Sequence, residues 1–305
     1  MILSAGLSPA WQQILRFETF RPGEVNRTVE AVWCASGKVI NVAIAVAALE
    51  RDITIISPAG GVSGEIIQQE IDALKIRSEW IPTASATRVC TTLLDNSGPA
   101  TELVEPAANL EAEAIEDFFG RTQIHANVAG VTVLTGSIPA NAPADLYARI
   151  LRNTHKRFIL DLRGEPLQHC LPLYPFLIKP NREELQATLG ISLATDAELL
   201  RAMRGLNDWG VRWVVVSDGP HGVWVTSDEI AVRLIPPAVH VVNSIGSGDA
   251  LAAGIACGLE HHDDVLAAVK LGMGAAANNV EQLLPARLNP QRTRELAAQV
   301  EVQEL

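Results

Sequence analysis

The chain has 305 residues, and 48% of them are hydrophobic, which is enough for a sizeable core. Its 24 Lys and Arg against 35 Asp and Glu give a formal net charge of −11, which argues against a generally basic surface for nucleic acid. No apolar stretch reaches the roughly 18 residues of a membrane span, and residues 1–9 predict a strand, not a signal peptide. We therefore expect a cytoplasmic protein that binds neither nucleic acid nor membrane.

Short apolar runs alternate with helical patterns along the chain. Ile67, Ile71 and Leu74 share one face of a predicted helix, and Thr195 with Glu198 has the spacing of a capping box before another. The apolar runs are rich in Val and Ile, as in strands buried on both faces, and lie at residues 53–56, 131–134, 158–162, 176–178 and 213–216. This alternation predicts an α/β fold with a mainly parallel sheet flanked by helices.

Two stretches of mixed polarity, about 11–33 and 87–105, break this alternation. Neither has the periodicity of a crossover helix, so we interpret them as strands of a small β-sheet that projects from the main one as a lid. Because no long linker interrupts the chain, residues 1–305 are predicted to form a single domain. Ligands of open parallel sheets bind at the carboxyl ends of the strands, so the residues after each strand are the candidates for function.

A glycine turn formed by Gly246, Ser247 and Gly248 follows an apolar run and opens a helix of small residues, with Asp249 at its start. The glycines let the backbone approach a ligand closely, and N–H groups at a helix N-terminus bind phosphate oxygens. A carboxylate beside that phosphate could take the proton of an attacking hydroxyl. The alternative is an ordinary turn in which Asp249 complements the helix dipole.

Residues 243–249, NSIGSGD, resemble the second signature of the PfkB, or ribokinase-like, carbohydrate kinase family. Further segments resemble this family's motifs in the same order: 36–43 (SGKVINVA), 135–139 (TGSIP), 161–165 (DLRGE), 179–185 (KPNREEL) and 217–222 (SDGPHG). Two more are typical of the branch that contains 1-phosphofructokinase and tagatose-6-phosphate kinase: 22–27 (PGEVNR) and 101–106 (TELVEP). The resemblance implies the ribokinase-like fold, ATP and Mg²⁺ as cofactors, and a homodimer.

The resemblance also implies a sugar site. Gly37 would allow close approach of the sugar, Lys38 would face an anion and Asn41 would hydrogen-bond a hydroxyl, whereas the residues alone suggest only a helix start with a solvated lysine. Gln12 and Ser137 fall in further segments on the substrate side.

Arg27 and Arg88 lie in the presumed lid, and with Lys38 they could clamp a substrate phosphate, since arginine offers phosphate a planar fork of donors. The alternative is that they are exposed arginines, which suit edge strands.

On the nucleotide side, Asn181 and Glu184 have the N-x-x-E spacing of a family segment that places Mg²⁺, which Glu184 would hold through water. The same pair would also serve as a helix cap. The remaining residues assigned to the nucleotide by resemblance are Lys179, Ser217, Gly219, Gly222 and Asn278. For the turn around Gly219 and Gly222, and for the small-residue helix that contains Asn278, tight packing alone is the other interpretation.

The chain departs from the family around the sugar. Gln12 replaces an aspartate that binds sugar hydroxyls, and a glutamine can donate and accept but carries no charge. Val104 stands where the branch usually has Asn, and Leu162 and Arg163 replace Thr and Ser.

The catalytic turn matches the family, so we expect ATP-dependent phosphorylation of a ketohexose phosphate, such as fructose 1-phosphate or tagatose 6-phosphate, with Asp249 as the base. A kinase of an unphosphorylated sugar or nucleoside is the alternative, and a non-catalytic sugar-phosphate sensor is a third hypothesis.

Overall fold

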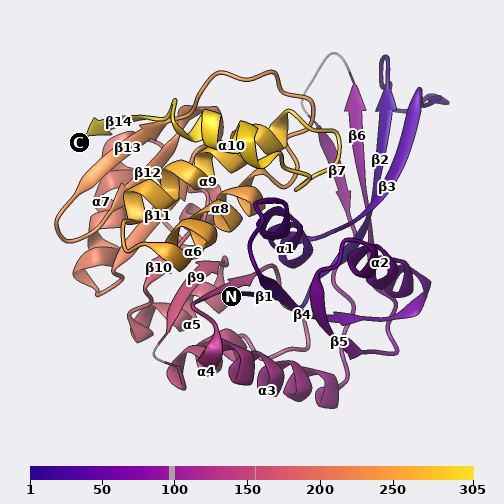
Figure 1. Ribbon diagram of the computed structural model, residues 1–305, viewed down its shortest axis with the longest axis horizontal. Helices are drawn as coiled ribbons and strands as arrows, with labels where there is room; N and C mark the ends of the chain where they lie inside the picture. The colour runs from indigo at the N-terminus through magenta and orange to yellow at the C-terminus, as the bar shows by residue number, and fades with distance from the viewer. Residues whose placement is uncertain (96–99, 155) are drawn as a thin grey trace.

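A computed structural model describes residues 1–95, 100–154 and 156–305. Residues 96–99, part of the second predicted lid stretch, lie outside the described residues. The main sheet has ten strands in the order β14-β13-β12-β11-β10-β9-β8-β1-β4-β5 (Figure 1). The parallel strands are β1 (Ile2–Ala5), β4 (Ile53–Ala59), β5 (Arg77–Pro82), β8 (Val131–Thr135), β9 (Arg157–Asp161), β10 (Leu177–Ile178) and β11 (Trp213–Ser217). The antiparallel edge consists of β12 (Val223–Thr226), β13 (Ala231–Ile235) and β14 (Glu301–Glu304).

Helices cover both faces of this sheet (Figure 1). They are α1 (Lys38–Ala48), α2 (Gly61–Ala73), α3 (Ala112–Val128), α4 (Leu146–Arg152), α5 (Glu165–Cys170), α6 (Arg182–Leu189), α7 (Asp196–Asp208), α8 (Ser247–His261), α9 (Val265–Val280) and α10 (Pro290–Ala297), with short 3₁₀ turns at Leu171–Leu173 and Gly219–His221. None of the helices in the described part of the chain is long and apolar enough to span a membrane.

The core has two layers, one on each face of the sheet. Val215 packs into the layer that contains α1, α8 and α9, whereas its neighbours Val214 and Val216 pack into the layer that contains α3, α4 and α7. Successive side chains of a strand point to opposite faces, so a strand covered on both sides needs an uninterrupted apolar run. The predicted α/β fold with a mainly parallel sheet is therefore confirmed.

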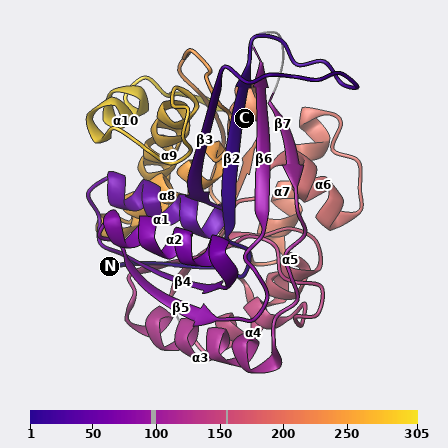
Figure 2. The same cartoon turned by 90° about the vertical axis from the view of Figure 1, so that its right-hand side faces the viewer.

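The lid is a separate sheet of four strands, β2 (Ala10–Phe17), β3 (Glu30–Ser36), β6 (Val89–Asp95) and β7 (Thr101–Val104), in the order β3-β2-β6-β7. Figure 2 looks onto this sheet, which stands up from the main body. The small projecting sheet expected from the two irregular stretches is present.

The helix caps form as the sequence predicts, whereas one predicted helix face is only partly buried. Asn181 and Thr195 each form the complete capping box of the following helix, as the spacing predicts for Thr195. Ile67 and Ile71 are buried on one face of α2, whereas Leu74, predicted to share that face, is 41% exposed, because α2 ends at Ala73 and Leu74 is its C-cap.

Candidate active site

A cavity of about 500 Å³ lies under the lid, at the carboxyl ends of the central strands and the N-termini of α1 and α8. Most of the residues singled out from the sequence line it: Gln12, Gly37, Lys38, Asn41, Arg88, Ser137, Lys179, Asn181, Glu184, Ser217, Gly246, Ser247, Gly248 and Asp249. They come from segments far apart in the sequence, and the parallel sheet brings them together because its strand ends share one edge.

The glycine turn is held in a left-handed conformation. Gly246 has φ 77°, and a Cβ at this position would come within 2.9 Å of Pro285 Cβ. Asn243 accepts a hydrogen bond from the Ile245 amide (3.0 Å), and Asn279 donates one to the Ile245 carbonyl (2.8 Å). A non-glycine residue at position 246 would be strained, so the turn that leads into α8 depends on this glycine.

Asp249 lies in the first turn of α8 and is only 6% exposed. The side-chain amide of Asn41 donates a hydrogen bond of 2.8 Å to its carboxylate. Burial and the charge of Asp161 raise the pKa of Asp249 above its ordinary range, while Lys38 and the Asn41 hydrogen bond oppose this shift. A buried carboxylate with a raised pKa, aligned by a neutral amide, can accept a proton near neutral pH.

A network of buried charges lies beside Asp249. Asp161 pairs with Lys179 (3.1 Å) and Lys38 (3.3 Å) and accepts a hydrogen bond from the Thr135 hydroxyl (3.0 Å). Burial alone would raise the pKa of Asp161, but Lys179 and Lys38 outweigh it and hold this pKa below the ordinary range. Asp161 is thus an ionised anchor that positions two lysine ammonium groups at the cavity wall.

Glu184 lies next to this network. One oxygen of its carboxylate contacts Lys38 (3.2 Å), and the other accepts the Asn181 backbone N–H (3.0 Å) as part of the capping box. Both interpretations of the N-x-x-E pair therefore remain compatible: the residues cap α6, and they line the cavity. Among the described residues no group of three or more His, Cys, Asp and Glu could hold a metal ion by itself.

The sequence profile of the pfkB family of carbohydrate kinases matches residues 10–292. The chain belongs to this family. It is 28% identical over 313 residues to a tagatose-6-phosphate kinase of Staphylococcus epidermidis, with all of both chains covered. Escherichia coli phosphofructokinase-2 in complex with substrates and products superimposes with a TM-score of 0.90 at 25% identity, over 97% of this chain and 98% of the other. A ribokinase of Thermotoga maritima shares the fold, with a TM-score of 0.78 at 19% identity over 97% and 99% of the two chains.

The lid of this carbohydrate kinase lines the cavity with Gln12, Cys90, Glu102 and Val104. The Gln12 side-chain amide donates to the Thr92 hydroxyl on the neighbouring strand (2.8 Å), so its donor is partly committed within the lid. Desolvation and the charge of Asp249 raise the pKa of Glu102, against the opposing effect of Arg88. Although Gln12 carries no charge, the lid thus still presents a carboxyl group, that of Glu102, to the cavity.

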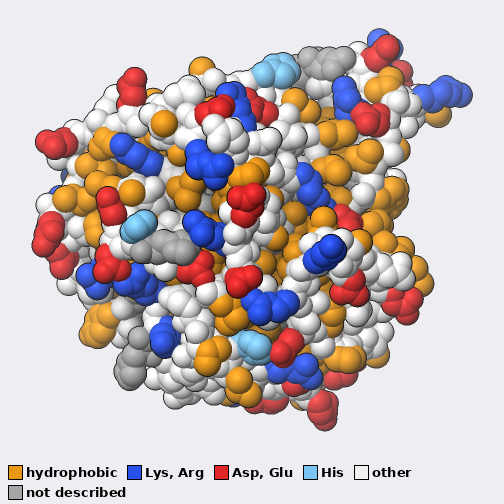
Figure 3. Space-filling model, viewed as in Figure 1, with side chains coloured by type: hydrophobic (Ala, Val, Ile, Leu, Met, Phe, Trp, Pro, Cys, Tyr) orange, Lys and Arg blue, Asp and Glu red, His pale blue; other side chains and the backbone are white. Residues whose placement is uncertain are grey.

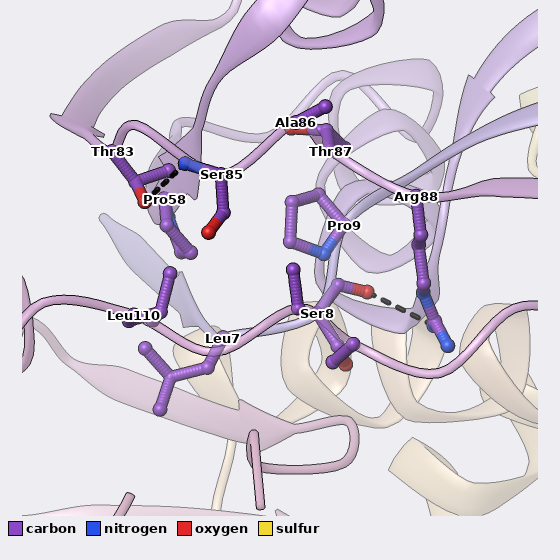
Figure 4. Close-up of a pocket in the computed structure, with 12 residues that line it drawn as sticks. Leu7, Ser8, Pro9, Pro58, Thr83, Ser85, Ala86, Thr87, Arg88 and Leu110 are labelled. Carbon is purple, nitrogen blue, oxygen red and sulfur yellow. Dashed lines mark hydrogen bonds between the residues drawn. The ribbon is translucent and has the colours of Figure 1, made fainter. Parts of the chain in front are cut away.

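Arg88 lies where the lid meets the main body. Its guanidinium donates to the backbone carbonyls of Glu105 (3.0 Å) and Ser8 (3.2 Å), and Figure 4 shows the second of these bonds. The guanidinium fork is therefore used in part to join the lid to the loop after β1.

Four of the sequence candidates do not line the cavity of this kinase. Arg27 is exposed in the loop between β2 and β3, at the far end of the lid. Gly219 and Gly222 lie between β11 and β12. Asn278 is buried, and its side chain bonds to Glu281 (3.2 Å) and to the Asn289 amide (2.7 Å), an arrangement that fixes the approach to α10.

The sequence interpretation did not assign a role to Asp161, Thr135, Glu102 or Arg163. Asp161 could have been found, since it is the last residue of its strand and is the acid of a matched motif. Glu102 lies in the matched segment 101–106, but its place under the lid depends on how β7 pairs with β6, which the sequence does not show.

Proposed function

We propose that this chain is an ATP-dependent sugar-phosphate kinase in which Asp249 deprotonates the acceptor hydroxyl. The observation that carries the proposal is the position of Asp249, a buried carboxylate with a raised pKa, held by Asn41 next to the Gly246 turn in a large cavity. Membership of a carbohydrate kinase family implies ATP as the phosphoryl donor.

In the proposed reaction, the acceptor hydroxyl gives its proton to the Asp249 carboxylate as its oxygen attacks the γ-phosphorus. A bond forms between this oxygen and phosphorus while the bond from phosphorus to the β-phosphate oxygen breaks, and ADP leaves. Backbone N–H groups of residues 246–248 would stabilise the charge on the transferring group, since they stand at the N-terminus of α8.

The residues fit a hydrated magnesium ion bound with the nucleotide. Mg²⁺ keeps several waters and is usually bound through one or two carboxylates and substrate phosphates, and Glu184 keeps free lone pairs for such waters. When bound, the ion would neutralise charge on the phosphates. The residues of the chain itself would orient it: Asn181 and Lys38 fix the Glu184 carboxylate.

The acceptor is proposed to be a ketohexose phosphate, as in the relative named a tagatose-6-phosphate kinase. Lys38 and Arg88, two of the three predicted phosphate-binding cations, line the cavity. Arg27 lies outside it, so its part in the clamp would require movement of the lid or a second copy of the chain.

A homodimer through the lid is also proposed. Leu15, Trp33, Leu93 and Leu103 lie on the face of the lid opposite to Gln12, as the pairing register requires, and Trp33 and Leu103 are 44% and 55% exposed. Figure 2 shows no helix in front of the upper part of this face, and Figure 3 shows hydrophobic side chains gathered along the lid side of the molecule. We place the kinase in the cytoplasm, where ATP is available and its four free cysteines stay reduced.

The test is ADP release from purified protein with Mg-ATP across phosphorylated and plain hexoses, pentoses and nucleosides. We expect release with a ketohexose phosphate and a loss of at least about 100-fold in Asp249→Asn. Release only with an unphosphorylated sugar or nucleoside would replace the proposed substrate, and turnover near wild type in Asp249→Asn would remove the base assignment. Tight binding of a sugar phosphate without any ATP-dependent product would favour a sensor instead.

A further inference from the structure

Arg163 stands at the mouth of the cavity, two residues after the end of β9. It is exposed, and within the described ranges its side chain makes no hydrogen bond and no ion pair. Arginine has five N–H donors in a rigid fork. The cavity wall therefore carries a guanidinium whose donors are uncommitted.

The other cations of the cavity wall already have partners. Lys38 contacts Asp161 and Glu184, and Lys179 contacts Asp161. Arg88 donates to two backbone carbonyls. An incoming dianion would have to compete with carboxylates at Lys38 and Lys179, whereas at Arg163 it would displace only water. Arg88 is intermediate, since two of its donors are used and its Nε has no hydrogen-bond partner among the described residues.

Arg163 faces the acceptor side of the site. It also lines an adjoining groove of about 520 Å³. The groove is formed by residues that follow β8, among them Ile138, Pro139 and Ala140, by Arg163 and the residues after it, and by Ala187 on α6. In the sheet order, β9 lies between β10, which leads to the nucleotide-side residue Ser217 at the end of β11, and β8, which leads to β1 on the acceptor side. Ser137, a candidate substrate residue, lies at the start of the same loop and lines the main cavity with Arg163.

The geometry points to Arg163 as a further residue that binds the phosphate group carried by the acceptor sugar, besides the cations Lys38 and Arg88 already proposed for it. The inference rests on the proposed function, and it specifies a phosphate monoester as the chemical class recognised at this point of the cavity. A guanidinium binds two phosphate oxygens with parallel N–H···O bonds, which a neutral sugar hydroxyl cannot match.

The experiment compares wild type with Arg163→Ser, Arg163→Lys and the matched control Arg201→Ser. Arg201 is an exposed arginine on α7 and does not line the cavity. KM and kcat are measured for fructose 1-phosphate, tagatose 6-phosphate, plain fructose and ATP, each with the co-substrate saturating. Calorimetric titration of each sugar phosphate without ATP gives binding independently of turnover.

We expect Arg163→Ser to raise KM and the calorimetric Kd for the sugar phosphate about tenfold to a hundredfold, because hydrogen bonds between charged groups are lost. Arg163→Lys should recover part of this loss, and KM for ATP, activity on plain fructose and all constants of Arg201→Ser should stay near wild type. An unchanged KM for the sugar phosphate in Arg163→Ser, or a rise in KM for ATP alone, would overturn the inference. Failure of the proposed function is seen separately, because wild type itself would then phosphorylate no sugar phosphate.

Discussion

The side-chain amide of Asn41, in the first turn of α1, donates a hydrogen bond of 2.8 Å to the carboxylate of Asp249, in the first turn of α8. These residues are 208 positions apart in the sequence, and both are buried. Asn41 in turn lies 3.1 Å from the Ser36 hydroxyl at the end of β3. Two hydrogen bonds thus connect the Asp249 carboxylate, through Asn41, to the last residue of β3, the lid strand that leads into α1.

Asn41→Ala should alter the pH dependence of the reaction. The Asn41 hydrogen bond opposes the rise in the pKa of Asp249, so its loss should raise that pKa further. Because transfer requires the ionised carboxylate, the acidic limb of the kcat profile should move to higher pH, and kcat at neutral pH should fall about tenfold. The measurement is kcat from acid to alkaline pH for both proteins. An acidic limb at the same pH in both would contradict the role of Asn41.

Asp249→Asn should be more heat-stable than wild type at neutral pH. The folded-state pKa of Asp249 is raised above its ordinary value of 3.8 by burial, so ionisation of this group in the native protein is unfavourable. Wild-type stability therefore falls as the pH rises through the folded-state pKa, and the amide removes this loss. The two melting temperatures should converge as the pH falls towards 3.8. A variant less stable than wild type at neutral pH would refute this account of the buried charge.

Much of the fold could be predicted from local signals. The apolar run at 213–216 became β11, since a strand with both faces covered needs no polar alternation. Asp249 and its glycines were identified because a turn before a helix N-terminus is encoded by adjacent residues. The antiparallel edge β12–β14 was not predicted, because β14 comes from the last residues of the chain and pairs with β13 only in the folded protein.

Side-chain partners were harder to foresee than positions. Lys38 was expected to face a substrate anion, and it lines the cavity, yet its ammonium group contacts Asp161 and Glu184. Asp161 and Glu184 lie 123 and 146 positions after Lys38 in the sequence, and no local pattern connects them with it. Arg27 was grouped with Arg88 because both lie in lid segments. Arg27, however, is in the long loop between β2 and β3, which carries it away from the cavity.

Asp161→Leu should destabilise the fold strongly, whereas Asp161→Leu combined with Lys179→Met should restore much of the loss. Both side chains of this pair are at most 3% exposed, so removal of Asp161 leaves a buried ammonium without its closest partner. Breaking a buried pair costs about 3–5 kcal/mol, while an apolar replacement of both partners is often close to neutral. Urea denaturation of the four proteins of the double-mutant cycle gives the free energies of unfolding. Additive losses in the double variant would show that the pair is not coupled.

The same pair predicts loss of stability in acid. The pKa of Asp161 is held below its ordinary value by Lys179 and Lys38 despite burial. The ionised carboxylate therefore contributes to the stability of the fold above its unfolded-state pKa, and this contribution is lost as the pH falls through its folded-state pKa. Wild type and Asp161→Leu should thus differ most at neutral pH and least in strong acid. A difference in urea midpoint that stays constant with pH would show that Asp161 acts through packing and not through its charge.

Gly246→Ala and Gly248→Ala should fail in different ways. At Gly246 a Cβ meets Pro285 and φ is 77°, so alanine should destabilise the protein by about 1–3 kcal/mol and distort the turn. At Gly248, the second residue of α8, the nearest atom to a new Cβ is Lys179 Nζ at 3.8 Å, so alanine should fit without destabilising the protein. Because that methyl group would occupy the space proposed for the transferring phosphoryl group, kcat should nevertheless fall at least about tenfold.

Gly23→Ala is the matched control for this pair. Gly23 lies in the lid loop with φ 85°, and an added Cβ meets nothing within 4 Å, so this variant reports backbone strain without a steric contact. Thermal melting and ATP-dependent turnover of all three variants separate the effects. If Gly248→Ala kept both its stability and full turnover, the added methyl group would not interfere with transfer. The phosphoryl group would then not approach the backbone closely at position 248.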